Sequence, residues 1–233
     1  MSENIKSIVF AIVLAIVSSL LLAIVTTGLK TYQIKNIQID KQKNILLAMG
    51  LIDDNTKYSN SEIEDFFNKN IKTLFADETG HIDNNEENTK KRLPIYIYQK
   101  NDNIDGYIIP INAKGLWGKI NGYMALKNDG STIVGFTVYK HQETPGLGGE
   151  IESKWFRKNF HEKKIINQAG DFVSIGIAKG KVNDQIAKDK QINYVDGISG
   201  ATLTGKYLSE SFKDILSEYE TVSLKFRTKN YRR

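Results

Sequence analysis

The feature that most constrains this chain is an uncharged, mostly apolar run from Ser7 to Leu29. As a helix rising ~1.5 Å per residue, this run would be roughly 34 Å long, enough to cross the hydrocarbon core of a membrane. The apolar region of a cleaved signal peptide is shorter, about 7–15 residues, and a site of small residues follows it. Residues 25–28, Val-Thr-Thr-Gly, make a poor cleavage site. We therefore expect a retained transmembrane helix over residues 7–29, after a short N-terminus at residues 1–6.

The charges beside this run give a weak indication of orientation. Lys6 precedes it, and Lys30, Lys35, Lys41 and Lys43 follow it. A simple positive-inside count would place the large C-terminal part in the cytoplasm. The rule has little force when a whole domain is translocated, so charge alone leaves the topology open.

The composition excludes several classes of site. The chain has 233 residues, no cysteine and a formal net charge of +5. Without cysteine there are no disulfides and no cysteine-ligated iron–sulfur clusters. The three histidines, His81, His141 and His161, are too far apart in sequence to form an i, i+4 metal pair. No nucleic-acid-binding motif is present. Because the chain has no cysteine, electron transfer by it would need a cofactor that thiolates do not hold.

We expect residues 30–93 to form a helical connecting region that ends in a polar loop. The N-terminal helical pattern continues after the membrane run and can end at Gly50. Ser59 and Glu62 have the spacing of a capping box, which predicts a second helix. Apolar residues at helical period extend that helix to Leu74.

From Pro94 onward the apolar period changes from helical to alternating. The segments expected as strands are residues 95–98, 104–110, 120–127, 132–141 and 172–178. Asn128-Asp129-Gly130 joins two of them as a hairpin turn, which indicates an antiparallel meander.

Two helices complete the predicted domain. A short one is expected near residues 155–160, and a longer one after Thr204 has apolar residues at helical spacing. We therefore predict an α+β fold in which helices pack on an antiparallel sheet, over residues 94–220. Residues 221–233 are basic and are expected to form a solvated tail.

The stretch from Asp196 to Gly205, Asp-Gly-Ile-Ser-Gly-Ala-Thr-Leu-Thr-Gly, leads into the last helix. The first N–H groups of a helix have no internal partner and the helix dipole is positive there, so the start of a helix attracts anions. Lys206 adds a cation. The spacing alone is more typical of an ordinary helix whose N-cap is Thr202 or Thr204.

Two further glycine-rich segments are candidates for a ligand site. Residues 143–150, Glu-Thr-Pro-Gly-Leu-Gly-Gly-Glu, follow a predicted strand and can approach a flat ligand closely. They match neither a dinucleotide fingerprint nor a P-loop and could simply be a long hairpin connection. Residues 115–118, Gly-Leu-Trp-Gly, present Trp117, which could stack on an aromatic ligand or belong to the core.

Together these residues resemble a known family. Ser-Gly-Ala-Thr-Leu-Thr at 199–204, preceded by Asp196, resembles the FMN-attachment motif of flavin-binding redox-pump subunits. Its combination with residues 115–118 and 143–151 resembles, more specifically, the C subunits of sodium-translocating NADH:quinone oxidoreductases. Gly205 stands where such a motif has serine, which weakens the helix start without removing a reactive group.

The resemblance implies a flavoprotein whose FMN is joined by a phosphoester to Thr204. A separate flavin transferase, using FAD as donor with magnesium, would attach it. The other cofactor-binding residues that the resemblance implies are Ser199, Gly200, Ala201, Thr202, Lys206, Glu143, Thr144, Gly146, Leu147, Gly148, Leu116 and Trp117. It implies no catalytic side chain and no metal site, since the flavin carries the redox chemistry.

The resemblance also implies a role and a location. The chain would relay electrons from NADH toward quinone, coupled to sodium export, among membrane, flavin and iron–sulfur subunits of one complex. It would be a single-pass protein of the cell inner membrane, with its N-terminus cytoplasmic and its FMN domain periplasmic. This orientation contradicts the simple lysine count.

Three alternatives stay open. The related G subunit of ferredoxin:NAD oxidoreductase complexes of the Rnf type shares the attachment motif. A flavin-free, membrane-anchored interaction domain would use the same residues only as a helix cap and a hairpin. A serine hydrolase using Ser199 is disfavoured, because the chain lacks a G-x-S-x-G elbow and a suitably placed histidine.

Overall fold

The computed structural model describes residues 2–84, 92–101 and 103–230. Parts of the predicted polar loop and of the predicted tail therefore lie outside the described residues. The chain divides into two compact units, one ending at Asp40 and one beginning at Lys41.

The first unit is the long N-terminal part of helix α1 (Glu3–Ala48), which contains the predicted membrane run. Its most apolar 18-residue window has a mean hydropathy of 3.1 and buries none of its residues against the protein. Among the described residues, α1 is the one helix long and apolar enough to cross a membrane. An exposed surface of leucine, isoleucine and valine side chains suits lipid rather than water, so α1 fits a single-pass membrane anchor.

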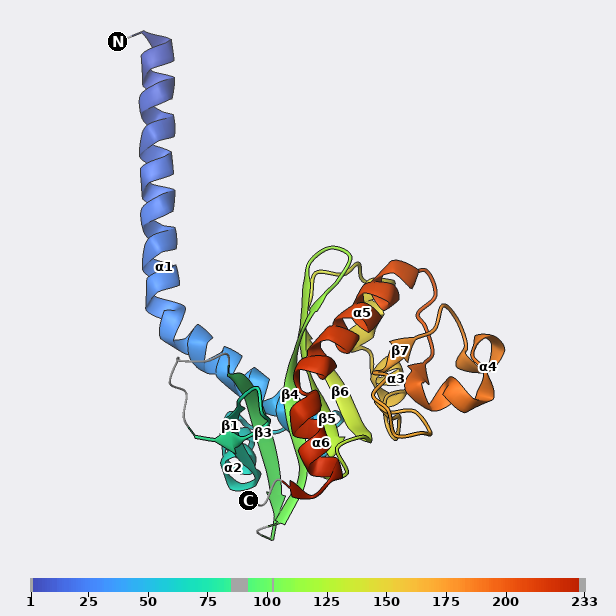
Figure 1. Ribbon diagram of the computed structural model, residues 1–233. Helices are drawn as coiled ribbons and strands as arrows, with labels where there is room; N and C mark the ends of the chain where they lie inside the picture. The colour runs from blue at the N-terminus through green and yellow to red at the C-terminus, as the bar shows by residue number, and fades with distance from the viewer. Residues whose placement is uncertain (1, 85–91, 102, 231–233) are drawn as a thin grey trace. The chain divides into compact units, whose positions relative to one another are not determined.

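The second unit is built on a six-stranded antiparallel sheet with the order β2-β1-β3-β4-β5-β6 (Figure 1). Its strands are β1 (Ile71–Ala76), β2 (Ile82–Asp83), β3 (Leu93–Lys100), β4 (Asn103–Lys114), β5 (Lys119–Lys127) and β6 (Ile133–Lys140). The strands β3 to β6 form the predicted meander, and Gly130 takes the positive φ of +65° that the turn before β6 requires. The predicted α+β class is confirmed.

The second predicted helix is shorter than expected. Helix α2 (Asn60–Asn70) begins at the predicted capping box, where Ser59 accepts a hydrogen bond from the Glu62 N–H. The prediction that this helix reaches Leu74 is wrong, because β1 starts at Ile71 and Leu74 pairs with Ile95 of β3. Pairing with a neighbouring strand outweighs the local helical period there.

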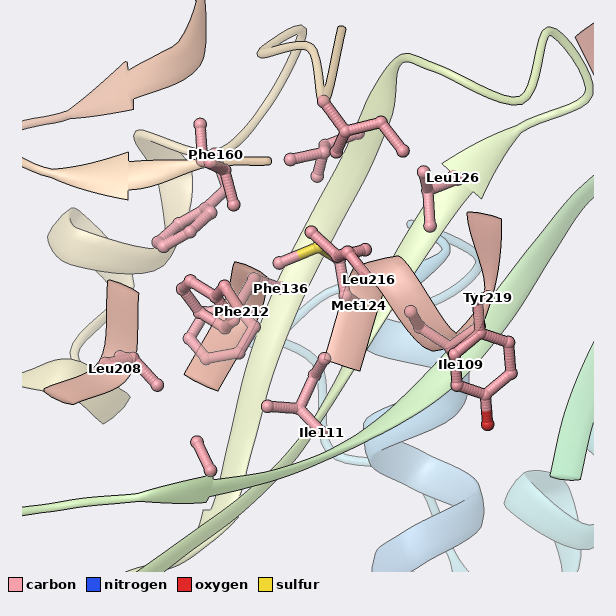
Figure 2. Packing of buried hydrophobic residues seen from close by; sticks show 14 of the residues in the cluster. Ile109, Ile111, Met124, Leu126, Phe136, Phe160, Leu208, Phe212, Leu216 and Tyr219 are labelled. Atoms are coloured by element: carbon pink, nitrogen blue, oxygen red, sulfur yellow. The ribbon is translucent and has the colours of Figure 1, made fainter. Parts of the chain in front are cut away.

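One face of the sheet is covered by α5 (Thr202–Glu218), α6 (Glu220–Arg227) and α3 (Lys154–Lys158). The centre of this core is an aromatic cluster in which the ring centroids of Phe136 and Phe212 lie 5.3 Å apart, and those of Phe136 and Phe160 4.7 Å apart (Figure 2). All three rings are almost completely buried. Edge-to-face packing of this kind holds α5 in a defined position on β6.

The start of the predicted basic tail is part of this core. Helix α6 buries Val222 and Phe226, and the Phe226 ring stacks on Tyr107 with a centroid distance of 4.4 Å. The Tyr107 hydroxyl also lies 2.7 Å from the Ser223 hydroxyl. The expectation of a solvated tail is therefore wrong for these residues, whose apolar side chains follow a helical period.

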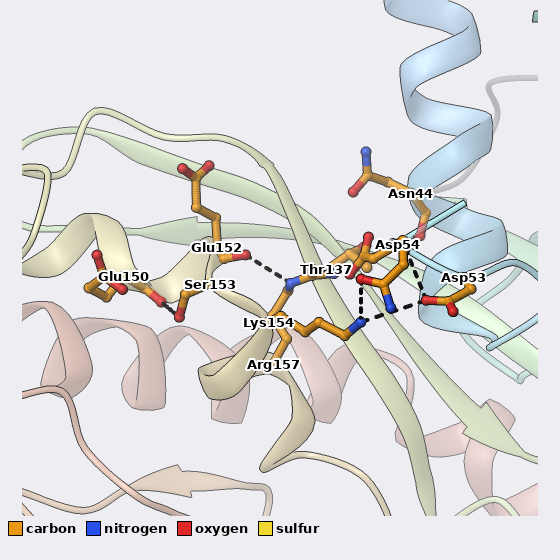
Figure 3. A network of polar contacts seen from close by, with 10 residues as sticks. Asn44, Asp53, Asp54, Thr137, Glu150, Glu152, Ser153, Lys154 and Arg157 are labelled. Atoms are coloured by element: carbon orange, nitrogen blue, oxygen red, sulfur yellow. Dashed lines mark hydrogen bonds and ion pairs between the residues drawn. The ribbon is translucent and has the colours of Figure 1, made fainter. Parts of the chain in front are cut away.

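The opposite face of the sheet is covered by the last turns of α1 and by α2. A Cβ on Gly135 would lie 2.5 Å from the Ala48 carbonyl oxygen, so this glycine lets α1 approach β6 closely. The loop after α1 is tied to α3 by polar contacts (Figure 3). In this network Lys154 donates to Asn55 at 3.0 Å, and Arg157 pairs with Asp54.

The remaining elements lie between β6 and α5. They are η1 (Gly148–Glu152), β7 (Gly176–Ile177), α4 (Val182–Gln185), η2 (Lys188–Asn193) and β8 (Tyr194–Val195). The strand predicted at 172–178 shrinks to β7, which pairs in parallel with β8. This region is irregular and leaves room for a cavity beside α5.

Replacing Phe212 by alanine tests the aromatic core. We expect Phe212→Ala to lower the free energy of unfolding by about 3–5 kcal/mol, because it removes a fully buried ring between two others. Denaturant unfolding of the full chain in detergent, followed by tryptophan fluorescence, measures it. The exposed Asp214→Ala change on the same helix should stay within about 0.5 kcal/mol. Equal effects of the two changes would contradict this packing.

Candidate functional site

The three glycine-rich segments meet at one buried carboxylate, that of Glu143. The Thr204 hydroxyl donates to Glu143 Oε2 at 2.6 Å, and the Trp117 backbone N–H donates to Oε1 at 3.0 Å. Glu143 is 4% exposed and Thr204 is 2% exposed. Charge-assisted hydrogen bonds are short and strong in such a setting. The carboxylate therefore fixes the loop at 115–118 and the start of α5 against the loop that begins at Glu143.

Glycines make this close approach geometrically feasible. A Cβ on Gly148 would lie 2.7 Å from both Glu143 Oε2 and the Thr204 hydroxyl oxygen. A Cβ on Gly115 would lie 2.5 Å from Glu143 Oε1. Both distances are far below van der Waals contact. Gly115 and Gly148 are therefore needed for their segments to pack directly against the Glu143 carboxylate.

The start of α5 has no side-chain cap. Its N-cap is Ala201, and no side chain among the described residues caps the first turn. The hypothesis that Thr202 or Thr204 is the N-cap is therefore wrong, because both residues lie inside the helix. The N–H groups of that turn and the helix dipole leave a positive end that suits an anion.

The two threonines of the motif have different surroundings. Thr202 is the first residue of α5 and is exposed, whereas Thr204 is buried against Glu143. Two positions along a helix correspond to a rotation of about 200°, so the two side chains face nearly opposite ways. Thr202 and Lys206 are one turn apart and share the face that borders a cavity.

That cavity has a volume of about 840 Å³ and lies between α5 and the irregular region before it. Its α5 wall is formed by Thr202, Lys206, Ser209, Glu210 and Lys213. The facing wall is formed by Asn167, Gln168, Ala169, Val173, Ser174, Ile175, Gly176, Ile177, Ala178, Lys179, Asp189, Lys190, Asn193 and Tyr194. Four lysines and two carboxylates line it, so its charge favours an anionic ligand. Sequence reasoning missed the facing wall, which carries no motif.

Asp196 has a structural role beside this site. It accepts hydrogen bonds from the Val182 N–H at 2.8 Å and from Lys181 at 2.9 Å. Burial alone would raise the pKa of Asp196, but these two hydrogen bonds and the positive charges of Lys181 and Lys163 outweigh burial and hold the pKa below its usual range. Asp196 therefore stays ionised and anchors the strand that leads into the motif.

Several predicted site residues lie on the outer surface of the same junction. Three of them, Leu116, Trp117 and Leu147, are 40–66% exposed. Leu203, which the sequence did not indicate as a site residue, is 50% exposed, and we refer to these four residues as the apolar rim. The option that Trp117 belongs to the core is therefore wrong. Ser199, Gly200, Thr144 and Gly146 are also exposed, and Gly200 and Gly146 adopt positive φ values of +74° and +73°.

Comparison with known proteins identifies the class of domain to which the site belongs. The family model of the FMN-binding domain matches residues 115–217, which contain the three segments that meet at Glu143. The fold defined above is thus that of an FMN-binding domain.

Similar proteins of known name identify the family within this class. The C subunit of the Na(+)-translocating NADH-quinone reductase of Pseudomonas aeruginosa is 30% identical, over 86% of this chain and 87% of its own length. The corresponding C subunit of Haemophilus ducreyi is 32% identical, over 87% and 85%. A crystal structure of the C subunit from Parabacteroides distasonis matches with a TM-score of 0.70 and 30% identity, over 84% of this chain and 96% of that one. The chain belongs to the family of Na(+)-translocating NADH-quinone reductase C subunits, and the predicted resemblance is confirmed.

Changing Glu143 tests the junction. Glu143→Ala leaves the Thr204 hydroxyl and the Trp117 N–H without their buried acceptor, so it should lower the free energy of unfolding by roughly 2–4 kcal/mol. Glu143→Gln can still accept from Trp117 and donate to Thr204, and we expect a loss of about 1 kcal/mol. Denaturant unfolding measures both.

Glu152→Ala is the matched control, because that carboxylate is 62% exposed and should change stability by no more than about 0.5 kcal/mol. A Glu143→Ala protein as stable as this control would show that the carboxylate does not hold the three segments together.

Proposed function

We propose that this chain is the FMN-carrying electron-transfer subunit of a membrane NADH:quinone reductase that exports sodium. The observation that carries the proposal is the convergence of three segments at Glu143, within the residues that match an FMN-binding domain. The similar proteins named above are C subunits of quinone reductases, which favours this complex over the ferredoxin:NAD oxidoreductase. A flavin-free interaction domain would not account for the match to an FMN-binding domain.

The residues present fit FMN. A cavity of about 840 Å³ lies within the usual range for cofactor sites. It borders a helix start without a side-chain cap, which suits a phosphate, and Lys206 lies one turn further along the same face. Bound flavin supplies the redox chemistry, while this chain supplies position and local charge.

We further propose that the flavin phosphate is attached to Thr202 rather than to Thr204. The Thr204 hydroxyl is buried and already donates to Glu143, and Gly148 lies directly against it. A phosphodiester on that oxygen would place two negative charges side by side away from water, which is costly. Thr202 is exposed, lies at the positive end of α5 and borders the cavity. Thr204 stays the sequence-based alternative.

Attachment needs a second protein, a flavin transferase that uses FAD with magnesium. The Thr202 oxygen bonds to the phosphorus of the FMN half of FAD. The phosphoanhydride bond breaks, AMP leaves with the bonding electrons, and the hydroxyl proton passes to the transferase. In this step Thr202 is the acceptor, and Glu143 acts by holding the start of α5 in place through Thr204.

The remaining parts of the proposal concern location. Residues 7–29 of α1 cross the membrane, residues 1–6 stay in the cytoplasm, and the FMN domain lies on the extracytoplasmic side. The other membrane, flavin and iron–sulfur subunits deliver electrons from NADH and pass them on to quinone. An apolar anchor with surface-exposed side chains supports the single span.

Flavin attachment is tested by single substitutions in the full chain, produced together with a flavin transferase. Thr202→Ala should lack covalent flavin, because the acceptor oxygen is gone. Thr204→Val should keep it, although the protein is less stable without the bond to Glu143. Flavin fluorescence of the protein band on a denaturing gel, normalised to protein stain, is the measurement. A fluorescent Thr202→Ala protein and a dark but folded Thr204→Val protein would reverse the assignment.

The orientation is tested with single cysteines, because the chain has none of its own. We expect a membrane-impermeant maleimide, applied to cells with a permeable outer envelope, to label Lys57→Cys, an exposed site after α1. Ser2→Cys at the other end of the span should react only after lysis. The opposite labelling pattern would place the domain in the cytoplasm.

A further inference from the structure

A histidine closes the turn that follows β6. His141 is the first residue beyond this strand, and its side chain is 13% exposed. Its Nδ1 accepts a hydrogen bond from the Glu143 backbone N–H at 3.1 Å. A ring nitrogen that accepts a hydrogen bond carries no proton of its own. His141 thus holds the backbone of the residue whose carboxylate joins the three glycine-rich segments.

The same ring lies against the far end of the loop formed by residues 143–149. A Cβ on Gly149 would be 3.4 Å from His141 Cε1, which is van der Waals contact. Within the loop, the Thr144 carbonyl accepts hydrogen bonds from the N–H groups of Leu147 and Gly149, at 3.1 and 2.9 Å. The imidazole therefore bridges the first and last residues of a tight loop.

The second ring nitrogen has a partner that suits one tautomer. A neutral imidazole has one donor and one acceptor nitrogen, so acceptance at Nδ1 places the proton on Nε2. Glu152 Oε2 lies 3.3 Å from Nε2 of His141, where it can accept from that N–H. The backbone of Glu152 is held in turn, because its carbonyl accepts from Arg157 Nε at 2.9 Å (Figure 3). Both nitrogens of the ring thus have partners that orient it.

This orientation determines where the next two side chains point. Gln142 packs directly on Gly118, where a Cβ would collide with the amide oxygen of Gln142. The Glu143 carboxylate accepts from the Trp117 N–H at 3.0 Å. Both side chains therefore contact the loop at 115–118, and their direction depends on the turn that the imidazole closes.

We propose that His141 is a positioning residue for the flavin, which holds the loop at 143–149 closed through Nδ1 and so keeps the Glu143 carboxylate at the start of α5. The inference rests on the proposed function and deepens it. The loop carries Thr144 and Leu147, which the family resemblance implies for FMN binding. His141 acts on the flavin through this loop and not by direct contact.

The experiment compares three substitutions of His141 in the full-length, flavin-loaded protein in detergent. In His141→Asn the amide oxygen is bonded to Cγ, as Nδ1 is, so it can still accept from the Glu143 N–H. In His141→Gln the amide lies one bond further out, near the position of Nε2, and His141→Phe has a ring without an acceptor. Without the acceptor, this N–H is satisfied by opening the loop to water, which should raise the open population roughly fivefold.

Two measurements report on the loop and on the flavin separately. Hydrogen exchange of the peptide that covers residues 143–149, followed by mass spectrometry, reports opening of the loop and needs no flavin. Quenching of flavin fluorescence by iodide, together with visible circular dichroism, reports the surroundings of the ring. In His141→Gln and His141→Phe we expect exchange about fivefold faster, stronger quenching and an altered dichroism. His141→Asn should stay near the starting values in each.

His161→Gln is the matched control, because the side chain of this histidine is 63% exposed and lies outside the loop. It should leave the exchange of the loop and the flavin signals unchanged. Exchange in β4 and β5 is the reference for folding of the whole domain.

The inference is overturned if His141→Asn changes the flavin signals as much as His141→Gln does, or if His141→Gln and His141→Phe leave them at their starting values. It is also overturned if exchange in β4 and β5 accelerates as much as in the loop, since His141 would then stabilise the whole domain. A natural-sequence chain that acquires no flavin mass refutes the proposed function instead, while exchange of its loop still tests His141. The two failures are therefore distinguishable.

Discussion

The hydrogen bond between Thr204 and Glu143 is the interaction on which the rest of the site depends. It joins the first turn of α5 to the loop after β6, and the second oxygen of the same carboxylate holds the loop at 115–118. The atoms are buried, and glycines remove the side chains that would otherwise keep the segments apart. A buried carboxylate is tolerated only when its donors are in place, so these segments form as a unit.

This junction sets the rotation of α5 about its axis. With Thr204 fixed on Glu143, Thr202 and Lys206 must face the cavity, and the apolar side of the helix must face Phe136 and Phe160. The exposed first residue, the positive helix end and the charge of the cavity therefore belong to one arrangement. The electron-transfer role follows from the flavin that such a site holds, and the protein contributes its position, its surroundings and its anchor in α1.

Much of this architecture was predictable from residue patterns. The apolar run in α1, the capping box of α2, the hairpin at Gly130 and the meander each have a local signature that the structure keeps. The predictions were wrong where contacts between distant parts of the chain determine the structure. Ile71 belongs to a helical sequence pattern but pairs with β3, and Phe226 lies in the predicted basic tail but stacks on Tyr107.

The candidate site was likewise predictable only where local sequence patterns determine it. The three glycine-rich segments could be picked out in the sequence, and their meeting at Glu143 fits the family of C subunits. Spacing could not tell Thr202 from Thr204, because their difference in burial comes from Glu143, a residue 61 positions away. The cavity wall around Ser174 was also out of reach, since it depends on an unusual backbone conformation.

The central claim is that Thr202 carries the covalent flavin, whereas Thr204 joins the start of α5 to Glu143. Its most direct test is fragment-ion mass spectrometry of the tryptic peptide from Gln191 to Lys206 of the natural-sequence, flavin-loaded protein, which contains both threonines. We predict that the FMN mass appears on the fragment ions that include Thr202 and is absent from C-terminal ions that begin at Leu203. Flavin mass on those C-terminal ions would place the tether on Thr204 and contradict the account.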